Sequence, residues 1–502
     1  MSQISISNLT FAYEGSYDNI FEDVSFMLDT DWKLGFTGRN GKGKTTFLNL
    51  LMGKYEYSGS ISSNVKFQYF PYSVMDKTKP TIAIVEEVCR EYQDWQLMRE
   101  LSLLDINNDV LHRPFETLSN GEQTKILLAA LFLTAETENN FLLIDEPTNH
   151  LDMGGRQIVS EYLNSKAGYI LVSHDRAFLD GCVTHILSIN KANIEVVRGN
   201  FSSWWANKEQ RDNYERAENE RLQKDIKRLE TAARQAHVWA DKVESSKMGR
   251  GAAMARKKGL TGAGSKEYKA EKSRKMQVRR KNLERRQDNA IEEKSALLKN
   301  LDYASDLKVT QLSHHKSRLL YLGDVSISYS NKLVCSGVTF DINQGDRVAL
   351  HGKNGSGKSS LLKLICGECI THSGEFATST GLKISYVSQD TSYLHGNLTD
   401  YAREYGIDES LFKAILRKLD FLRVQFEKDM RDYSGGQKKK VLLARSLCEQ
   451  AHLLVWDEPL NFVDVLSRMQ IERLLLEYKP TILFVEHDRV FCDAVATRVI
   501  GL

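Results

Sequence analysis

Two copies of one glycine-rich motif constrain the fold of this chain more than any other feature. The copies span residues 38–45 and 352–359, and both have the pattern G-x-x-x-x-G-K-[ST]. The first copy follows a strand-like run and precedes a helical one, which is the context in which this pattern forms a phosphate-binding loop. Its glycines let backbone N–H groups turn toward phosphate oxygens, and the helix N-terminus adds its positive end to the same place.

The lysine and the hydroxyl residue that end each copy have chemical roles. We expect Lys44 to reach the β- and γ-phosphates and the Thr45 hydroxyl to ligate Mg²⁺, with Lys358 and Ser359 as their counterparts. ATP and Mg²⁺ are therefore the expected cofactors. The residues predicted to hold the nucleotide in the two loops are Gly38, Asn40, Gly41, Lys42, Gly43, Lys44, Thr45 and Thr46, and Gly352, Asn354, Gly355, Ser356, Gly357, Lys358, Ser359 and Ser360.

Three further motifs recur in the same order in both halves. They are a serine that starts a helix, an apolar strand that ends in Asp-Glu, and a later strand that ends in a histidine. Their members are Ser119, Gly121, Gln123, Asp145, Glu146 and His174, and then Ser434, Gly436, Gln437, Asp457, Glu458 and His487. The copies are offset by 314 residues at the lysines, 315 at the serines, 312 at the aspartates and 313 at the histidines. A register this constant indicates a tandem duplication.

Two adjacent carboxylates at the end of a buried strand suit the hydrolysis of a bound nucleotide. The aspartate can bind Mg²⁺ through water, and the glutamate after it can orient or deprotonate the attacking water. The histidine that follows the later strand is predicted to contact the γ-phosphate. Asp145 and Asp457 are the carboxylates assigned to Mg²⁺, beside the hydroxyls of Thr45 and Ser359, and the assigned catalytic residues are Glu146, Glu458, His174 and His487.

In this order the motifs resemble those of the nucleotide-binding domain of ATP-binding-cassette (ABC) proteins. The resemblance implies that the signature sequence around the serine of one half faces the phosphate loop of the other, so that ATP closes the two halves on each other. Both sites would hydrolyse ATP, because both glutamates are present. Adenine would stack on Tyr13 or Phe11 in the first half and on Tyr329 in the second. Gln389 holds the place of a glutamine that contacts Mg²⁺, whereas Tyr72 holds that place in the first half.

A strongly charged stretch without proline separates the two halves. Residues 208–300 contain 26 Lys and Arg against 15 Asp and Glu, a net charge of +11, whereas the whole chain carries +2. Apolar residues at helical spacing predict two helices, over about 205–245 and 268–301, that pair as a hairpin. A glycine-rich segment, 248–265, breaks the helical pattern between them and would form the tip.

The positive charge is concentrated in one part of this stretch. Residues 246–281 contain 13 Lys and Arg against two acidic residues. Such a segment favours a polyanion, and rRNA phosphates are the expected target; a hairpin whose charges are merely solvated is the alternative. The residues predicted to form the deepest part of the tip are Met248, Arg250, Arg256, Lys257, Lys258 and Leu260.

These features predict an α/β protein with two tandem ABC-type P-loop ATPase domains, 1–207 and 315–502, joined by a long α-helical hairpin linker, 208–314. No run approaches the ~20 apolar residues of a membrane span, and the N-terminus lacks a signal-peptide pattern. The seven cysteines are scattered, which is typical of reduced thiols in the cytoplasm. Cys366 and Cys369 form a CxxC without a second pair, so we expect no zinc or redox role for them.

Two ABC domains, no membrane span and a basic linker resemble the ABC-F family of cytosolic ATPases, which bind the ribosome at the tRNA exit site. The resemblance implies a monomer whose own domains pair. Its partners would be large-subunit rRNA and tRNA, with no membrane and no transporter subunit.

Within this family the chain resembles the antibiotic-resistance group of the Lsa and Vga type. The segment from Tyr72 to Ser119 spans 47 residues and that from Gln389 to Ser434 spans 45. This leaves no room for the arm that housekeeping translation factors of the family often insert in the first domain. The resemblance implies protection of the peptidyl-transferase centre from lincosamides, pleuromutilins and streptogramin A. A housekeeping translation factor and a DNA-repair or chromosome ATPase are the alternatives.

Overall fold

The computed structural model describes residues 2–14, 19–41, 43–137, 140–149, 151–189, 194–255, 311–329, 332–419 and 421–502. The chain divides into two compact units. The larger unit, called the ATPase unit after the predicted function of its two halves, comprises Met1–Trp204 and Asp306–Leu502, and the linker unit comprises Trp205–Ser305.

The first half of the ATPase unit contains two sheets. The antiparallel sheet has the order β2-β1-β4, with β1 (Gln3–Phe11), β2 (Phe21–Asp29) and β4 (Ser58–Ser62). The larger sheet has the order β5-β6-β7-β3-β8-β9, with β5 (Lys66–Phe70), β6 (Asn140–Asp145), β7 (Tyr169–Val172), β3 (Lys33–Thr37), β8 (His185–Ile189) and β9 (Ile194–Arg198). All its pairs are parallel except β8 with β9.

The parallel strands are buried because helices and the smaller sheet cover both of their faces. All four residues of β7 are buried, and α1 (Lys44–Leu51) packs Phe47 and Leu48 into the core beside Phe36 of β3. Strands β3, β6 and β7 run in the same direction, so their carboxyl ends meet at one edge of the sheet. That edge is where ligands bind in open parallel sheets.

Helices connect the strands of the larger sheet. They are α2 (Thr81–Val88), α3 (Asp94–Leu103), α4 (Asn120–Thr137), α5 (Met153–Asn164) and α6 (Arg176–Cys182), with 3₁₀ turns η1 (Asn108–His112) and η2 (Phe115–Thr117). Helices α2 and α3 pack on α4. Asp152 and Asp175 cap α5 and α6, because each carboxylate accepts a backbone N–H of the first helical turn.

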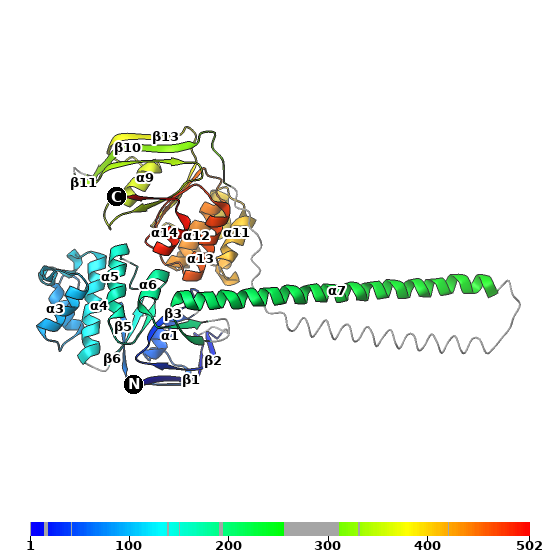
Figure 1. The fold of residues 1–502 in the computed structure, drawn as a ribbon, viewed down its shortest axis with the longest axis horizontal. Helices are drawn as coiled ribbons and strands as arrows, with labels where there is room; N and C mark the ends of the chain where they lie inside the picture. Colours follow the sequence, from blue (N-terminus) through cyan, green and yellow to red (C-terminus); the bar gives the residue numbers. More distant parts are fainter. Residues whose placement is uncertain are drawn as a thin grey trace. The chain divides into compact units, whose positions relative to one another are not determined.

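The second half repeats this architecture (Figure 1). The antiparallel sheet β11-β10-β13 consists of β11 (Lys332–Asn343), β10 (Arg318–Tyr329) and β13 (His372–Thr378). The parallel sheet β14-β15-β16-β12-β17 consists of β14 (Ile384–Val387), β15 (Leu453–Asp457), β16 (Ile482–Val485), β12 (Arg347–His351) and β17 (Arg498–Gly501). Its helices are α9 (Lys358–Ile365), α10 (Leu398–Glu404), α11 (Glu409–Lys418), α12 (Gly435–Cys448), α13 (Val465–Tyr478) and α14 (Arg489–Val495), with η3 (Arg423–Glu427) and η4 (Met430–Asp432). The prediction of two tandem α/β domains is confirmed.

The linker contains one long described helix, α7 (Phe201–Ala255), of 55 residues. It begins inside the ATPase unit, where Phe201 and Trp204 are buried and the Ser202 N–H donates to Asp180 Oδ1 at 2.8 Å. The prediction that residues from 248 onward break the helix is wrong for 248–255, which are helical. An interior glycine costs only ~1 kcal/mol, and the methionine, arginine and alanines around Gly249 and Gly251 favour helix.

The remaining linker predictions fall partly outside the described residues. Met248 and Arg250 lie in α7, whereas Arg256, Lys257, Lys258, Leu260 and the predicted return helix lie outside. Among the described helices, none combines the length and the apolar composition needed to span a bilayer.

Candidate active sites

The first phosphate loop joins β3 to α1, and its backbone requires glycine at two positions. Gly41 and Gly43 have φ angles of 76° and 95°, in the left-handed region. A Cβ on Gly43 would lie 2.5 Å from Cγ2 of Ile20. The ammonium of Lys44 donates to the carbonyl of Gly38 at 2.7 Å, and burial lowers the pKa of this lysine. Lys42 lies outside the described residues.

The second phosphate loop has the same geometry. Gly355 and Gly357 have φ angles of 81° and 89°. Lys358 donates to the carbonyl oxygens of Gly352 and Lys353 at 2.8 and 2.9 Å, and burial lowers its pKa. Both loops therefore hold a partly desolvated ammonium against their own carbonyls, at the N-terminus of a helix, where a phosphate can replace those carbonyls.

A hydroxyl cluster surrounds the aspartate at the end of β6. Thr45 Oγ1 donates to Asp145 Oδ2 at 3.1 Å, and the Tyr69 hydroxyl donates to the same oxygen at 2.9 Å. Burial raises the pKa of Asp145, and both hydrogen bonds oppose that shift. Tyr69 was not predicted, although the sequence holds a signal: Tyr386 stands at the same place in β14.

The aspartate at the end of β15 fits a cation. Burial raises the pKa of Asp457, and a hydrogen bond with Ser359 opposes that shift. Asp457 Oδ1 is buried and has no hydrogen-bond partner among the described residues. A buried carboxylate oxygen without a partner is costly, and oxygen ligands are those that Mg²⁺ prefers. The residues present therefore suit Mg²⁺ in this position.

The two predicted catalytic glutamates share a strained backbone. Glu146 and Glu458 have φ angles of 52° and 47°, in the left-handed region that non-glycine residues rarely adopt. Each N–H donates to the end of the neighbouring strand, to Val172 O at 2.9 Å and to Val485 O at 3.1 Å. Such strain persists only where the surroundings enforce it, and it is commonly found at functional sites.

At the first site the glutamate and the histidine are neutral together. His174 Nε2 lies 3.3 Å from Glu146 Oε1. Burial and the charge of Asp145 raise the pKa of Glu146 to about 8, and burial lowers the pKa of His174 well below its usual value. At pH 7 this contact therefore joins a protonated carboxyl to an uncharged imidazole.

At the second site the glutamate is charged. Glu458 Oε2 accepts Gln389 Nε2 at 2.8 Å and Asn461 Nδ2 at 2.6 Å, and His487 Nε2 lies 3.6 Å from Glu458 Oε1. Burial alone would raise the pKa of Glu458, but the imidazole of His487 and two nearby lysines outweigh burial and lower the pKa. Gln389 supplies one of the two amide donors, and Tyr72 takes its place in the first half. The two sites are therefore chemically different.

The signature serines start α4 and α12. Ser434 and Gln437 form a capping box, in which the Ser434 N–H donates to Gln437 Oε1 at 2.9 Å. In the first half the corresponding partner of Ser119 is Glu122. The predicted Gln123 instead donates to the carbonyl oxygens of its own half at positions 115 and 118, at 3.1 and 3.0 Å. The structure thus places Glu122, rather than Gln123, at the position of Gln437.

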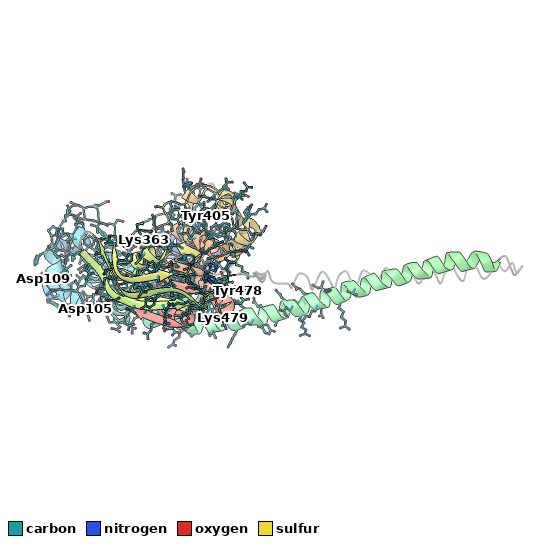
Figure 2. The ribbon with its side chains drawn as sticks, turned by 90° about the horizontal axis from the view of Figure 1, so that it is seen from above. Asp105, Asp109, Lys363, Tyr405, Tyr478 and Lys479 are labelled. Atoms are coloured by element: carbon teal, nitrogen blue, oxygen red, sulfur yellow. The ribbon has the colours of Figure 1, made fainter. Side chains whose placement is uncertain are left out.

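Each phosphate loop meets residues of the other half within the ATPase unit. A cavity of about 1160 Å³ lies between the second loop and the first signature; its lining includes Ser119, Gly121, Glu122, Gly352, Asn354, Gly355, Gly357, Lys358, Ser359, Ser360, Gln389, Glu458 and His487. Asp105, labelled in Figure 2, also lines it. At the first loop, Asn40 Nδ2 donates to Phe462 O at 2.9 Å, and a Cβ on Gly436 would lie 3.1 Å from that nitrogen.

The aromatic residues predicted to stack on adenine differ in their surroundings. Tyr13 and Tyr329 are equally exposed, at 44%. The Tyr13 hydroxyl is 2.7 Å from Thr46 Oγ1, and its ring packs edge-on against Phe11 and Tyr55. Tyr329 is not among the residues that line the cavity.

Comparison with known proteins relates both halves to one family. A sequence model described as "ABC transporter" matches residues 21–149 and 335–461, more than half of the chain. The chain is 28% identical over 504 residues to the ribosome protection protein VmlR of Bacillus subtilis (strain 168), covering 98% of this chain and 85% of that protein. It is 26% identical over 512 residues to the probable ATP-binding protein YheS of Escherichia coli (strain K12), covering 94% and 74%.

A solved structure shares the fold. It is the complex of the archaeal ribosomal stalk protein aP1 with the archaeal ribosome recycling factor aABCE1. The TM-score is 0.63 and the identity 16%, over 98% of this chain and 87% of that chain. At this identity the likeness shows the fold alone.

Proposed function

Because the chain belongs to the ABC transporter family of ATPases, and because a long polar helix, α7, follows the first of its two ATPase halves, we propose that it is an ABC-F type ATPase that acts on the ribosome. We propose further that it protects the peptidyl-transferase centre from antibiotics. The observation that carries the proposal is α7, a 55-residue helix placed between two sets of ATPase motifs. Similarity along 98% of the chain to a protein named for ribosome protection supports it.

In this proposal the two phosphate loops hold the phosphates of ATP. Lys44 and Lys358 leave the loop carbonyls and bind the β- and γ-phosphates. The residues that would hold Mg²⁺ are Thr45 and Asp145 at the first site, and Ser359, Asp457 and Gln389 at the second. When bound, Mg²⁺ neutralises charge on the β- and γ-phosphates. The signature residues that close the sites are Ser434, Gly436 and Gln437 at the first, and Ser119 and Gly121 at the second.

Hydrolysis would depend on the two strained glutamates. Glu458 is held by the amide groups of Gln389 and Asn461, with a lowered pKa, and is ready to accept a proton from the attacking water. Glu146 carries its proton at pH 7 and must lose it first. His174 and His487 lie beside these carboxylates, where they can contact the γ-phosphate. ATP holds the halves together, and hydrolysis releases them.

The linker would supply the contact with the ribosome. A helix of 55 residues is about 80 Å long at ~1.5 Å per residue, which is long enough to reach far from an ATPase core. Residues 246–281 carry 13 Lys and Arg against two acidic residues, a charge balance that suits rRNA phosphates. The residues that we propose for the deepest contact are Met248, Arg250, Arg256, Lys257, Lys258 and Leu260. The protein would act in the cytoplasm as a monomer.

A drug-susceptibility panel tests this function. Expression in a susceptible bacterium should raise the inhibitory concentrations of lincosamides, pleuromutilins and streptogramin A. Inhibitors of the small subunit should be unaffected, and the double variant Glu146→Gln, Glu458→Gln should give no protection. Unchanged susceptibility to every drug would indicate a translation factor instead. A changed response to DNA damage alone would indicate a repair ATPase.

A further inference from the structure

The second ATP site contains a carboxylate where the first site has an amide. Helices α4 and α12 begin in the same way, with a serine whose backbone N–H donates to the side chain three residues later. That side chain is Glu122 in α4 and Gln437 in α12. The two residues have the same size and shape and differ by one negative charge.

The Glu122 carboxylate accepts two hydrogen bonds from its serine, whereas the Gln437 amide accepts one. The Ser119 N–H and the Ser119 hydroxyl both donate to Glu122 Oε2, each at 2.8 Å. In α12 the Ser434 N–H donates to Gln437 Oε1 at 2.9 Å, and the Ser434 hydroxyl donates to no acceptor among the described residues. Glu122 therefore occupies both donors of its serine, whereas Gln437 leaves the hydroxyl of its serine available.

Ser119 and Glu122 both line the cavity at the second phosphate loop. The lining of this 1160 Å³ cavity also includes Lys358 and Ser359 of that loop. Lys125 lines the same cavity one turn further along α4. A γ-phosphate bound by Lys358 would need hydrogen bonds from Ser119 when it contacts the signature. Both Ser119 donors already bond to the Glu122 carboxylate.

We propose that Glu122 competes with the γ-phosphate of ATP for Ser119, and so sets a higher ATP threshold for closure of the second site than of the first. Both groups are anions that seek the same hydroxyl and N–H, so they exclude each other. On ATP binding the carboxylate turns away toward Lys125, a lining residue whose charge already interacts with Glu122. After hydrolysis and phosphate release, the Glu122 carboxylate again accepts the hydrogen bonds of Ser119 and opposes the binding of the next ATP. This inference rests on the ATPase activity of the chain and not on its ribosomal partner.

Nucleotide binding in a hydrolysis-deficient background tests the proposal. In the full chain with Glu146→Gln and Glu458→Gln, equilibrium dialysis with radiolabelled ATP should give two classes of site. Adding Glu122→Gln should tighten the weaker class about tenfold, because one like charge is removed next to the γ-phosphate. ADP affinity should stay within about twofold, because ADP has no γ-phosphate to compete.

The mirror variant and a folding control complete the experiment. Gln437→Glu, in the same background, should weaken the stronger class by a similar factor for ATP and leave ADP binding unchanged. Glu122→Gln keeps an acceptor for the Ser119 N–H, so thermal unfolding should not shift. Equal changes in ATP and ADP affinity, or weaker ATP binding with Glu122→Gln, would overturn the proposal.

Discussion

Replacing one catalytic glutamate at a time separates the two ATP sites and reveals their different pH dependence. The variant Glu458→Gln leaves the first site able to hydrolyse ATP, and Glu146→Gln leaves the second. Burial and the charge of Asp145 raise the pKa of Glu146 to about 8, whereas the groups around Glu458 lower its pKa. For a general base, the pKa of the free enzyme governs the pH dependence of kcat/KM.

The expected difference is large enough to measure. A base with a pKa of about 8 is ~9% ionised at pH 7 and ~90% ionised at pH 9. The kcat/KM of the Glu458→Gln variant should therefore rise about tenfold over that range. The Glu146→Gln variant should show no such rise, because Glu458 is already ionised. Phosphate release at ATP concentrations below KM gives both profiles, and their ratio cancels the titration of ATP itself.

A third variant tests whether the amide contributes to the difference. Tyr72→Gln, added to Glu458→Gln, places an amide where the second half has Gln389. If that amide stabilises the carboxylate, the rise between pH 7 and pH 9 should shrink. Parallel profiles for the two single-site variants would refute the reasoning, since the two glutamates would then titrate alike.

Three further predictions concern the first phosphate loop, the Mg²⁺ site beside Asp145 and the ion pair between the two halves. Gly43→Ala should cost ~1–3 kcal/mol of stability, seen as a lower Tm, and should abolish nucleotide binding at the first loop, because φ is 95° there and a Cβ would strike Ile20. Tyr69→Phe, with the second site inactivated, should raise the half-saturating Mg²⁺ concentration more at pH 6 than at pH 8. The Tyr69 hydroxyl lowers the pKa of Asp145, so its loss raises that pKa and leaves more of the carboxyl protonated at pH 6. Arg176→Ala should lower Tm, because it removes a 2.6 Å ion pair with α13, whereas Arg489→Ala, its exposed counterpart, should not.

The cores of both halves were predictable because their strands are continuous apolar runs. The sequence indicated a strand before the first phosphate loop and another before His174, and β3 and β7 lie at those places. Both strands are covered on two faces, so local apolar content alone identifies them. The duplication was also predictable from the constant offset of the motifs, since the fold repeats the strand order that this offset implies.

Helix ends in the linker were less predictable. Gly249 and Gly251 suggested a break, yet α7 runs on to Ala255. Two glycines weaken a helix by an amount that the surrounding strong helix formers can offset, so glycine content alone does not fix a helix end.

The site residues that were missed depend on contacts between segments. Tyr69 reaches Asp145 because β5 and β6 are neighbours, which the spacing along the chain does not reveal. Glu122 was overlooked because the residue that follows it, Gln123, has the same residue type as Gln437 of the second signature. The helix register places Glu122, and not Gln123, three residues after the serine. The recurrence of tyrosine at 386 was the one available signal for Tyr69.

Cosedimentation with ribosomes tests the central proposal most directly. The chain with Glu146→Gln and Glu458→Gln should bind ATP without hydrolysing it, so its two halves should stay closed. We expect this variant to pellet with ribosomes in ATP and to remain in the supernatant in ADP. A variant that binds ATP and yet never pellets with ribosomes would contradict the proposal that this ATPase acts on the ribosome.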